Sequence, residues 1–221
     1  MRFEQCVNVA GAYADRVAHQ FGLGQDYLSL PFKGTYMTLT EERNHWVNGN
    51  IYPVPDLRNP FLGVHLSRNA DGQVYVGPTA IPAFGRENYG ITRGLGRESL
   101  SILYRDALMF ARNSGFRTAA VREMRKYVPR YIYREAKKLV PALERADVLT
   151  SAKVGIRPQL VHWPTKQLVG DYVIERDDRS LHLLNAISPA FTSSMAFAPY
   201  VVSMLTNPDA EQSGSPSNQV V

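Results

Sequence analysis

The residues best suited to chemistry lie in the segment Lys153–Pro158, which reads Lys-Val-Gly-Ile-Arg-Pro. The segment predicts a strand that runs into the proline and presents Arg157 beside Gly155. A guanidinium can hold a carboxylate through two parallel hydrogen bonds, and a glycine lets another group approach the backbone closely. Arg157 is therefore a candidate ligand for an organic acid. A salt bridge to Asp147 or Asp171 is the alternative interpretation, and both stay open.

A second candidate site is the run of small polar residues from Ser188 to Ser194. It precedes an apolar stretch that predicts a helix beginning near Met195. The free N–H groups and the positive dipole end of a helix start favour an anion, such as the charge that develops on a reduced flavin's pyrimidine ring. An ordinary cap by Thr192 or Ser193 is the alternative. Pro199 falls inside this helix and should kink it or shift its start.

The histidines are scattered and do not predict a metal site. No pair has the spacing of metal ligands on a helix, and the chain has neither an H-E-x-x-H motif nor a cysteine cluster. His65 follows Gly63-Val64 on a predicted strand, and we take it as the candidate for proton transfer. The sequence also contains no G-x-S-x-G, Walker or G-x-G-x-x-G motif.

Four stretches of different pattern must position these residues. Residues 5–10 predict a short buried strand, Gly11 a tight turn, and residues 13–21 a helix ended by glycines. Residues 28–90 alternate and carry prolines, which predicts antiparallel sheet with a hairpin turn at 69–72. Residues 97–149 change to helical spacing, broken by Gly115 and Pro129 into about three helices. Residues 150–206 return to strands, with a hairpin around 177–179 and one final helix.

The sequence has a net charge of +5 and a single cysteine, which bear on the protein's binding partners and on its redox compartment. Cys6 alone cannot form an intrachain disulfide, which fits a reducing compartment. Much of the positive charge lies on the predicted helices, among Tyr127, Tyr131 and Tyr133, an arrangement that also occurs in nucleic-acid-binding proteins. Because these tyrosines fall at helical spacing, we expect them to pack against the sheet, and we expect no nucleic-acid partner. No apolar stretch is long enough to span a bilayer.

Six segments, taken in order, resemble the L-2-hydroxyglutarate dehydrogenase/oxidase group of the D-amino-acid-oxidase-like flavoproteins. They extend over nearly the whole chain up to about residue 205. The segments are residues 7–22, 30–36, 49–68, 74–90, 154–158 and 181–196. Any one of them is a weak signal, and the six together are specific for the group.

The resemblance implies an α/β fold with an α+β substrate lobe. A partial, Rossmann-like FAD-binding lobe would comprise residues 1–27 and 150–206. A mixed antiparallel sheet covered by helices, residues 28–149, would bind the substrate. The tail, residues 207–221, is rich in Ser, Pro, Asn and Gln, and its composition predicts disorder.

The resemblance also implies roles for particular residues, with FAD as the cofactor. Arg157 would bind the substrate carboxylate beside the flavin, with His65 as the base that takes the hydroxyl proton. Lys33 and Tyr52 are further candidates for the substrate pocket. The residues that would contact the cofactor are Ala10, Gly11, Gly155, Thr192, Ser193, Ser194 and Met195. The implied reaction oxidises L-2-hydroxyglutarate or a similar 2-hydroxy acid to the 2-oxo acid.

Two further expectations concern the binding partners of the chain and its location in the cell. The group begins with a G-x-G-x-x-G segment that this sequence does not contain, so we expect the chain to be incomplete as an enzyme alone and to need an N-terminal FAD-binding partner chain. The alternative is a non-catalytic interaction module derived from the substrate lobe. By resemblance we expect a cytoplasmic protein with peripheral contact to the inner membrane and its quinone pool.

Overall fold

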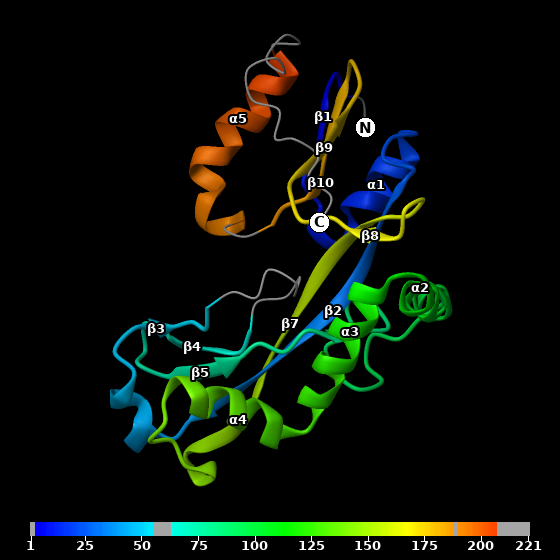
Figure 1. Cartoon of the computed structure of the whole chain (residues 1–221). Coiled ribbons are helices and arrows are strands. Elements are labelled where there is room, and N and C mark those ends of the chain that lie inside the picture. The colour runs from blue at the N-terminus through cyan, green and yellow to red at the C-terminus, as the bar shows by residue number, and fades with distance from the viewer. Residues whose placement is uncertain (1–2, 55–62, 188–189, 207–221) are drawn as a thin grey trace. The chain divides into compact units, whose positions relative to one another are not determined.

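The computed structural model describes residues 3–54, 63–187 and 190–206 (Figure 1). The chain divides into two compact units, one comprising Met1–Leu30 and Pro158–Val221 and the other Pro31–Arg157. Two long strands, β2 (Tyr27–Leu39) and β7 (Val148–His162), have residues in both units. The expected disordered tail lies outside the described residues.

The first unit begins with the strand, turn and helix that the sequence predicts. Strand β1 (Cys6–Asn8) leads through the 3-10 turn η1 (Gly11–Tyr13) into helix α1 (Ala14–Gln20). Gly11 has a φ of +56°, a conformation that glycine adopts at little cost. β1 pairs in parallel with β10 (Ser180–Asn185), as expected where a helix connects back to a sheet.

The expected hairpin of the first unit is confirmed. Strand β9 (Val173–Arg176) pairs antiparallel with β10, and the Asp177 carboxylate closes the turn by accepting the N–H groups of Arg179 and Ser180. Short strand β8 (Gln167–Leu168) pairs with the end of β7. The core of this unit joins α1 to these strands through buried Ala14, Ala18, Leu160, Val173 and Leu184.

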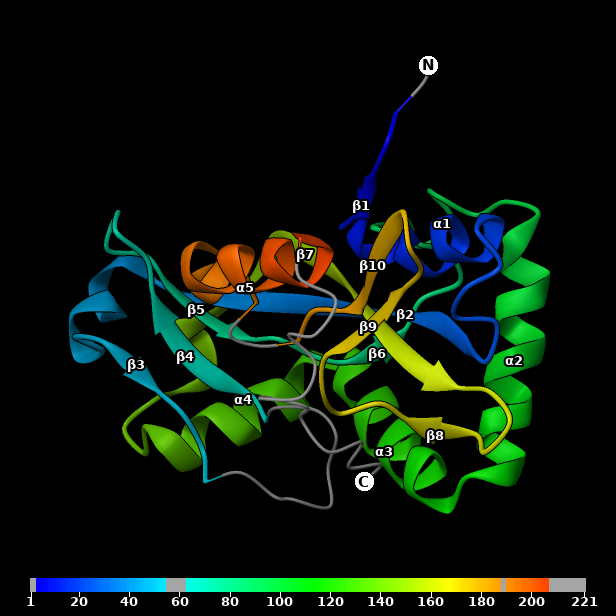
Figure 2. The ribbon, with the colours of Figure 1, turned by 90° about the horizontal axis from the view of Figure 1, so that it is seen from above.

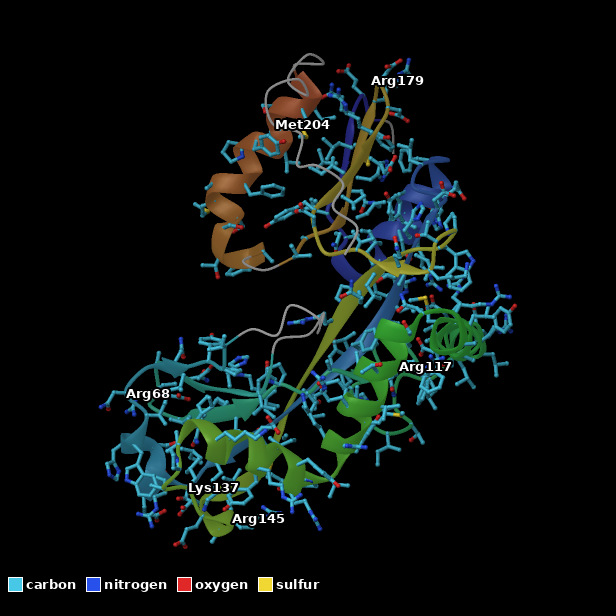
Figure 3. All side chains as sticks on the ribbon, viewed as in Figure 1. Arg68, Arg117, Lys137, Arg145, Arg179 and Met204 are labelled. Carbon is cyan, nitrogen blue, oxygen red and sulfur yellow. The ribbon has the colours of Figure 1, made fainter. Side chains whose placement is uncertain are left out.

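The last helix, α5 (Ser194–Thr206), follows the 3-10 turn η5 (Ala190–Ser193). It starts within a residue of the expected position and continues through Pro199 as one helix. Its apolar face packs Val201 and Met204 against Leu181 of β10. The Arg176 guanidinium donates to the Met204 carbonyl at 2.7 Å, which ties the helix end to β9 (Figure 3).

The second unit is built on an antiparallel sheet, as predicted for residues 28–90. Its strands pair in the order β3-β4-β5-β2-β7, and β6 also pairs with β2 (Figure 2). The shorter strands are β3 (Asn50–Ile51), β4 (His65–Arg68), β5 (Val74–Gly77) and β6 (Ile81–Pro82). The predicted turn joins β4 to β5: the Gly72 N–H donates to the Asn69 carbonyl, and Gly72 has a φ of +87°.

Three helices fill the predicted helical region, namely α2 (Glu98–Arg112), α3 (Ser114–Met124) and α4 (Pro129–Leu139). Pro129 begins α4 at a position where a missing N–H costs nothing. The expected break at Gly115 is wrong, because Gly115 lies inside α3. The break falls at Asn113, whose side chain caps α3 by accepting the Phe116 N–H at 2.8 Å.

Short 3-10 turns connect these elements: η2 (Glu41–Trp46), η3 (Arg125–Tyr127) and η4 (Arg145–Asp147). The expectation that all three tyrosines pack against the sheet is partly wrong. Tyr133 packs against the sheet core, whereas Tyr127 in η3 is 57% exposed. Lys126 is buried and paired with Glu123, unlike exposed Arg117 and Lys137 (Figure 3).

The apolar face of the sheet in the second unit forms a buried core. It packs buried residues of β2, β4 and β5 against Ile132 and Ala136 of α4. The buried strand residues are Met37, Leu39, Val64, Leu66, Val74 and Val76. Because alternate residues face opposite sides of a sheet, residues between these positions form a second surface, on which Tyr36, His65 and Tyr75 are half-buried. The chain is thus a mixed α/β protein. No helix in the described part of the chain is long and apolar enough to cross a membrane.

Candidate functional site

The polar surface of the second unit has a cavity of about 180 Å³ between β2 and β7. Side chains alternate between the two faces of a strand, so every second residue of β2 and β7 points to the cavity. These residues are Phe32, Gly34 and Tyr36 on β2 and Gly155 and Arg157 on β7. The segment after β5 closes one side. The complete lining is Phe32, Gly34, Tyr36, Pro78, Thr79, Ala80, Gly155, Ile156 and Arg157.

Two glycines on neighbouring strands form the floor of this cavity. A Cβ atom on Gly34 would lie 3.9 Å from the Gly155 carbonyl oxygen and only 3.0 Å from a Pro78 side-chain carbon. A Cβ atom on Gly155 would meet no atom within 4 Å, so the space above this residue is open. The sheet surface is thus open above Gly155, whereas Pro78 and the Thr79 carbonyl lie close above Gly34.

Arg157 is exposed at the end of the second unit and lines this cavity. Among the residues that the structure describes, its guanidinium has no carboxylate partner. Asp147 instead pairs with Arg43, at 2.8 Å, and Asp171 accepts the N–H of Tyr172. The salt-bridge alternative for Arg157 is therefore wrong for Asp147, because η4 directs that carboxylate to Arg43.

His65 and Tyr52 meet on the same polar surface. Their rings stack with centroids 4.5 Å apart and 28° between planes. The His65 Nδ1 lies 3.0 Å from the Gly63 carbonyl, which can only accept, so this nitrogen carries the proton and Nε2 is free to take one. Burial lowers the pKa of His65, and the charge of Arg157 lowers it further against the raising effect of the Gly63 bond. The imidazole is therefore neutral at pH 7.

Gly77, which has no side chain, lies between His65 and Tyr36 on this face of the sheet. His65 pairs directly with Gly77 of β5, and Gly77 in turn adjoins Tyr36 of β2. A Cβ atom on Gly77 would lie 2.9 Å from the Thr35 carbonyl and 3.0 Å from the Tyr36 ring, and its φ is +149°. Burial raises the pKa of Tyr36, and the nearby Arg157 charge opposes that rise. Arg157 thus acts electrostatically on both His65 and Tyr36.

The structure does not bring Lys33 to the cavity. Lys33 falls between Phe32 and Gly34, so its side chain leaves the opposite face of β2. It is buried, and its ammonium donates to the Gly90 carbonyl. Burial lowers the pKa of Lys33. The described contacts give it a structural role, in holding the segment that contains Gly90.

Sequence reasoning missed three polar or aromatic residues beside the cavity. The Lys153 ammonium lies 3.9 Å from the Tyr75 ring centroid and 5.1 Å from that of Tyr36. The two tyrosine rings meet edge to face at 6.2 Å. The signal was present in the sequence, because Lys153, Gly155 and Arg157 are spaced two apart and so share one face of a strand.

A buried ion pair holds the cavity wall formed by residues 78–80. Glu123 of α3 accepts the Ala80 N–H at 2.9 Å with one carboxylate oxygen and bonds Lys126 with the other. The Thr79 hydroxyl lies 3.0 Å from that of Thr35 on β2. These bonds satisfy polar groups that would otherwise be buried without partners, and they fix the wall against the strand.

The remaining predicted cofactor residues lie in the first unit. Ala10 and Gly11 are exposed after β1, and the buried Asn8 side chain fixes their turn by bonding the Ala10 N–H, the Ala14 carbonyl and His182. Thr192 to Met195 span the start of α5, where Thr192 and Met195 are exposed. The Ser193 hydroxyl donates to the Ala190 carbonyl at 3.0 Å. Ser188 and Pro189 lie outside the described residues.

The chain matches a known family over most of its length. The family described as FAD dependent oxidoreductase matches residues 2–204. L-2-hydroxyglutarate dehydrogenase of Escherichia coli strain K12 is 36% identical over 208 residues, which cover 94% of this chain and 49% of that protein. The mitochondrial L-2-hydroxyglutarate dehydrogenase of Homo sapiens is 33% identical over 203 residues, covering 90% of this chain and 43% of that protein. The chain spans about half the length of the curated relatives that it matches.

A solved structure shares the fold. An FAD-bound, dithionite-reduced L-alpha-glycerophosphate oxidase from Mycoplasma pneumoniae matches with a TM-score of 0.56 and 21% identity, over 91% of this chain and 42% of that one. At this identity the similarity shows the fold alone. The relatives confirm the resemblance that the six sequence segments predict.

Proposed function

Because this chain belongs to the family of FAD dependent oxidoreductases, we propose that it supplies the substrate site of an enzyme that oxidises L-2-hydroxyglutarate or a similar 2-hydroxy acid. The observation that carries the proposal is Arg157, a cation without a carboxylate partner among the described residues, at a glycine-floored cavity. A carboxylate placed there would receive charge-assisted hydrogen bonds in a fork geometry.

The residues of the second unit supply binding and proton transfer. Arg157 would bind the carboxylate next to the carbinol carbon and so fix the orientation of the substrate. His65 would take the hydroxyl proton at Nε2, since its Nδ1 proton is held by Gly63 and the ring is neutral at pH 7. Tyr52 stacks on His65 and would hold the imidazole plane.

FAD is the cofactor of this family, and when bound it accepts the hydride from the carbinol carbon. We propose that the first unit holds part of it in a Rossmann-like arrangement. Two features of this unit fit such a role. The β1–η1–α1 connection turns at Gly11 with a φ of +56°, and α5 begins with exposed residues at the positive end of its dipole. Thr192 to Met195 would supply N–H groups there.

The proposal is tested by titrating the purified chain with L-2-hydroxyglutarate and following amide chemical shifts. We expect shifts centred on the cavity residues, and an affinity loss of roughly 10- to 100-fold in Arg157→Ala, the range for losing a charge-assisted bond. Arg145→Ala is the matched control, because Arg145 is an exposed arginine of η4. Equal affinity of Arg157→Ala and the unsubstituted chain would contradict the proposed site.

Redox activity is tested separately by adding to the same chain FAD, an electron-accepting dye and a second chain that carries the N-terminal G-x-G-x-x-G segment of the family. We expect dye reduction by L-2-hydroxyglutarate to fall in His65→Gln, with little change in substrate affinity, because His65 would move a proton and not bind the carboxylate. A His65→Gln variant as fast as the unsubstituted chain would remove His65 from the mechanism. Retained binding of a macromolecular partner in a preparation that never takes up flavin would favour a non-catalytic interaction module instead.

A further inference from the structure

Two cations stand on one strand, on either side of the cavity floor. Lys153 and Arg157 flank Gly155 on the same face of β7, each two residues away from it. At about 3.3 Å per residue, their Cα atoms are roughly 13 Å apart. Neither cation has a carboxylate partner among the residues that the structure describes, although both belong to a chain with 20 acidic residues.

Aromatic rings hold the Lys153 ammonium in place. It lies 3.9 Å from the ring centroid of Tyr75, inside the range of a cation–π contact, and 5.1 Å from that of Tyr36. Tyr36 itself lines the cavity. Lys153 does not itself line the cavity, but its ammonium is a positioned charge beside Tyr36, whereas an unrestrained lysine on a surface would sample many rotamers.

The spacing of the two cations fits a short dicarboxylate. In an extended five-carbon diacid the two carboxylate carbons are about 5 Å apart, from C–C bonds of about 1.5 Å. Adding the carboxylate oxygens and a hydrogen bond of about 2.8 Å at each end, the two cationic nitrogens would be roughly 10–12 Å apart. This is slightly less than the Cα spacing, so both side chains would tip inward over the glycines.

We propose that Lys153 binds the second carboxylate of a five-carbon 2-hydroxy diacid whose first carboxylate is bound by Arg157. The carbon chain of the diacid lies over Gly155, where a Cβ atom would meet nothing within 4 Å. Lys153 is thereby a specificity-determining residue that favours diacids over monoacids. The inference rests on the proposed function, since it takes Arg157 as the ligand of the first carboxylate.

The energetic reason for selectivity is that Lys153 contributes only to ligands that reach it. A monocarboxylic 2-hydroxy acid of the same length would place an apolar end against the ammonium and gain nothing from the charge. A four-carbon diacid is shorter by about 1.3 Å and would lengthen one of the two hydrogen bonds beyond its favourable range. A five-carbon diacid satisfies both cations at once.

The test compares two ligands of equal chain length, L-2-hydroxyglutarate and L-2-hydroxypentanoate, by calorimetric titration of the full chain. Lys153→Gln should weaken binding of the diacid by about 10-fold or more and leave that of the monoacid within about 2-fold. Arg157→Ala should weaken both. Lys138→Gln is the matched control, because Lys138 is an exposed lysine of α4 paired with Glu135. Melting temperatures verify that each variant is folded.

The outcomes separate the two proposals. If Arg157→Ala weakens both ligands and Lys153→Gln changes neither, or changes both equally, the role of Lys153 is overturned and the proposed function stands. If the unsubstituted chain binds neither ligand, or if Arg157→Ala changes neither, the proposed function fails and the inference fails with it. A diacid-selective loss in Lys153→Gln supports both.

A second variant tests the glycine floor. Gly155→Val should fold normally, because a Cβ atom there meets nothing within 4 Å, yet its branches would occupy the space assigned to the carbon chain. We expect an unchanged melting temperature and loss of binding for both ligands by more than about 10-fold. Unchanged diacid affinity in a folded Gly155→Val variant would place the ligand elsewhere.

Discussion

The two faces of the sheet in the second unit are made by the same strands and differ completely in composition. One face packs Met37, Leu66 and Val76 against α4 and is closed to solvent. The other face carries His65, Gly77 and Tyr36 at the neighbouring positions of the same three strands. The first face stabilises the sheet, and the second is left to present chemistry on a rigid support. Alternation along each strand is what separates these two tasks.

The largest effect should come from the packed face. Leu66→Ala removes a fully buried side chain next to α4 and should lower the free energy of unfolding by about 2–5 kcal/mol. Ser67→Ala, one residue further along β4 on the polar face, should change it by less than about 0.5 kcal/mol. Urea denaturation followed by circular dichroism measures both. Similar losses in the two variants would mean that the polar face also carries the fold.

Glycines on the polar face should differ from one another. Gly77→Ala should cost about 1–3 kcal/mol, because the new Cβ would lie 2.9 Å from the Thr35 carbonyl at a φ of +149°. Gly155→Ala has open space above it and should be neutral or slightly stabilising. Thermal denaturation of the pair provides the comparison. A Gly77→Ala variant as stable as Gly155→Ala would remove the steric requirement at β5.

Helix α2 contains an ionisable group, Asp106, that is partly buried. Asp106 lies on the face of α2 that also buries Ile102 and Met109, and its Oδ2 atom has no partner among the described residues. Burial raises the pKa of Asp106 to about 7. Because the folded pKa lies above the unfolded value, the protonated form favours folding. The stabilisation of the folded state by protonated Asp106 is complete below about pH 4 and is lost as the pH rises through 7.

Asp106→Asn should therefore remove this part of the pH dependence. The variant keeps the shape of the side chain without the charge, and we expect it to be more stable than the unsubstituted protein at pH 8, by about 1–2 kcal/mol. At pH 4 the two proteins should have nearly equal stability. Urea midpoints measured from pH 4 to pH 8 check this, and parallel curves for the two proteins would show that Asp106 does not titrate on folding.

The smallest effect concerns coupling across the polar face. The Arg157 charge is one of the causes that lower the pKa of His65, so Arg157→Leu should raise that pKa while burial keeps it below its ordinary value. The chemical shifts of the His65 ring protons, followed against pH, measure the change. Arg145→Leu should leave the His65 titration where it is. An identical His65 pKa in both variants would show that the two groups are electrically independent.

Local patterns in the sequence predicted most elements of the fold. The change of period from two to 3.6 near residue 97 located the helices, and turn residues located both hairpins. The errors arose where two local signals, such as a helix cap and a nearby glycine, favour different boundaries for the same helix. Asn113 caps a helix that Gly115 was expected to break, and Tyr127 lies exposed in a 3-10 turn although its spacing predicted packing.

The sequence by itself determined which residues share a face, because side chains alternate along any strand. Lys153, Gly155 and Arg157 share a face in whatever sheet β7 joins. Only the tertiary structure decided that Gly34 lies beside Gly155 and that Lys153 lies over Tyr36 and Tyr75. Strand pairing joins residues more than a hundred positions apart, and its register is set by burying the opposite, apolar face against α4. The cavity is a consequence of that register.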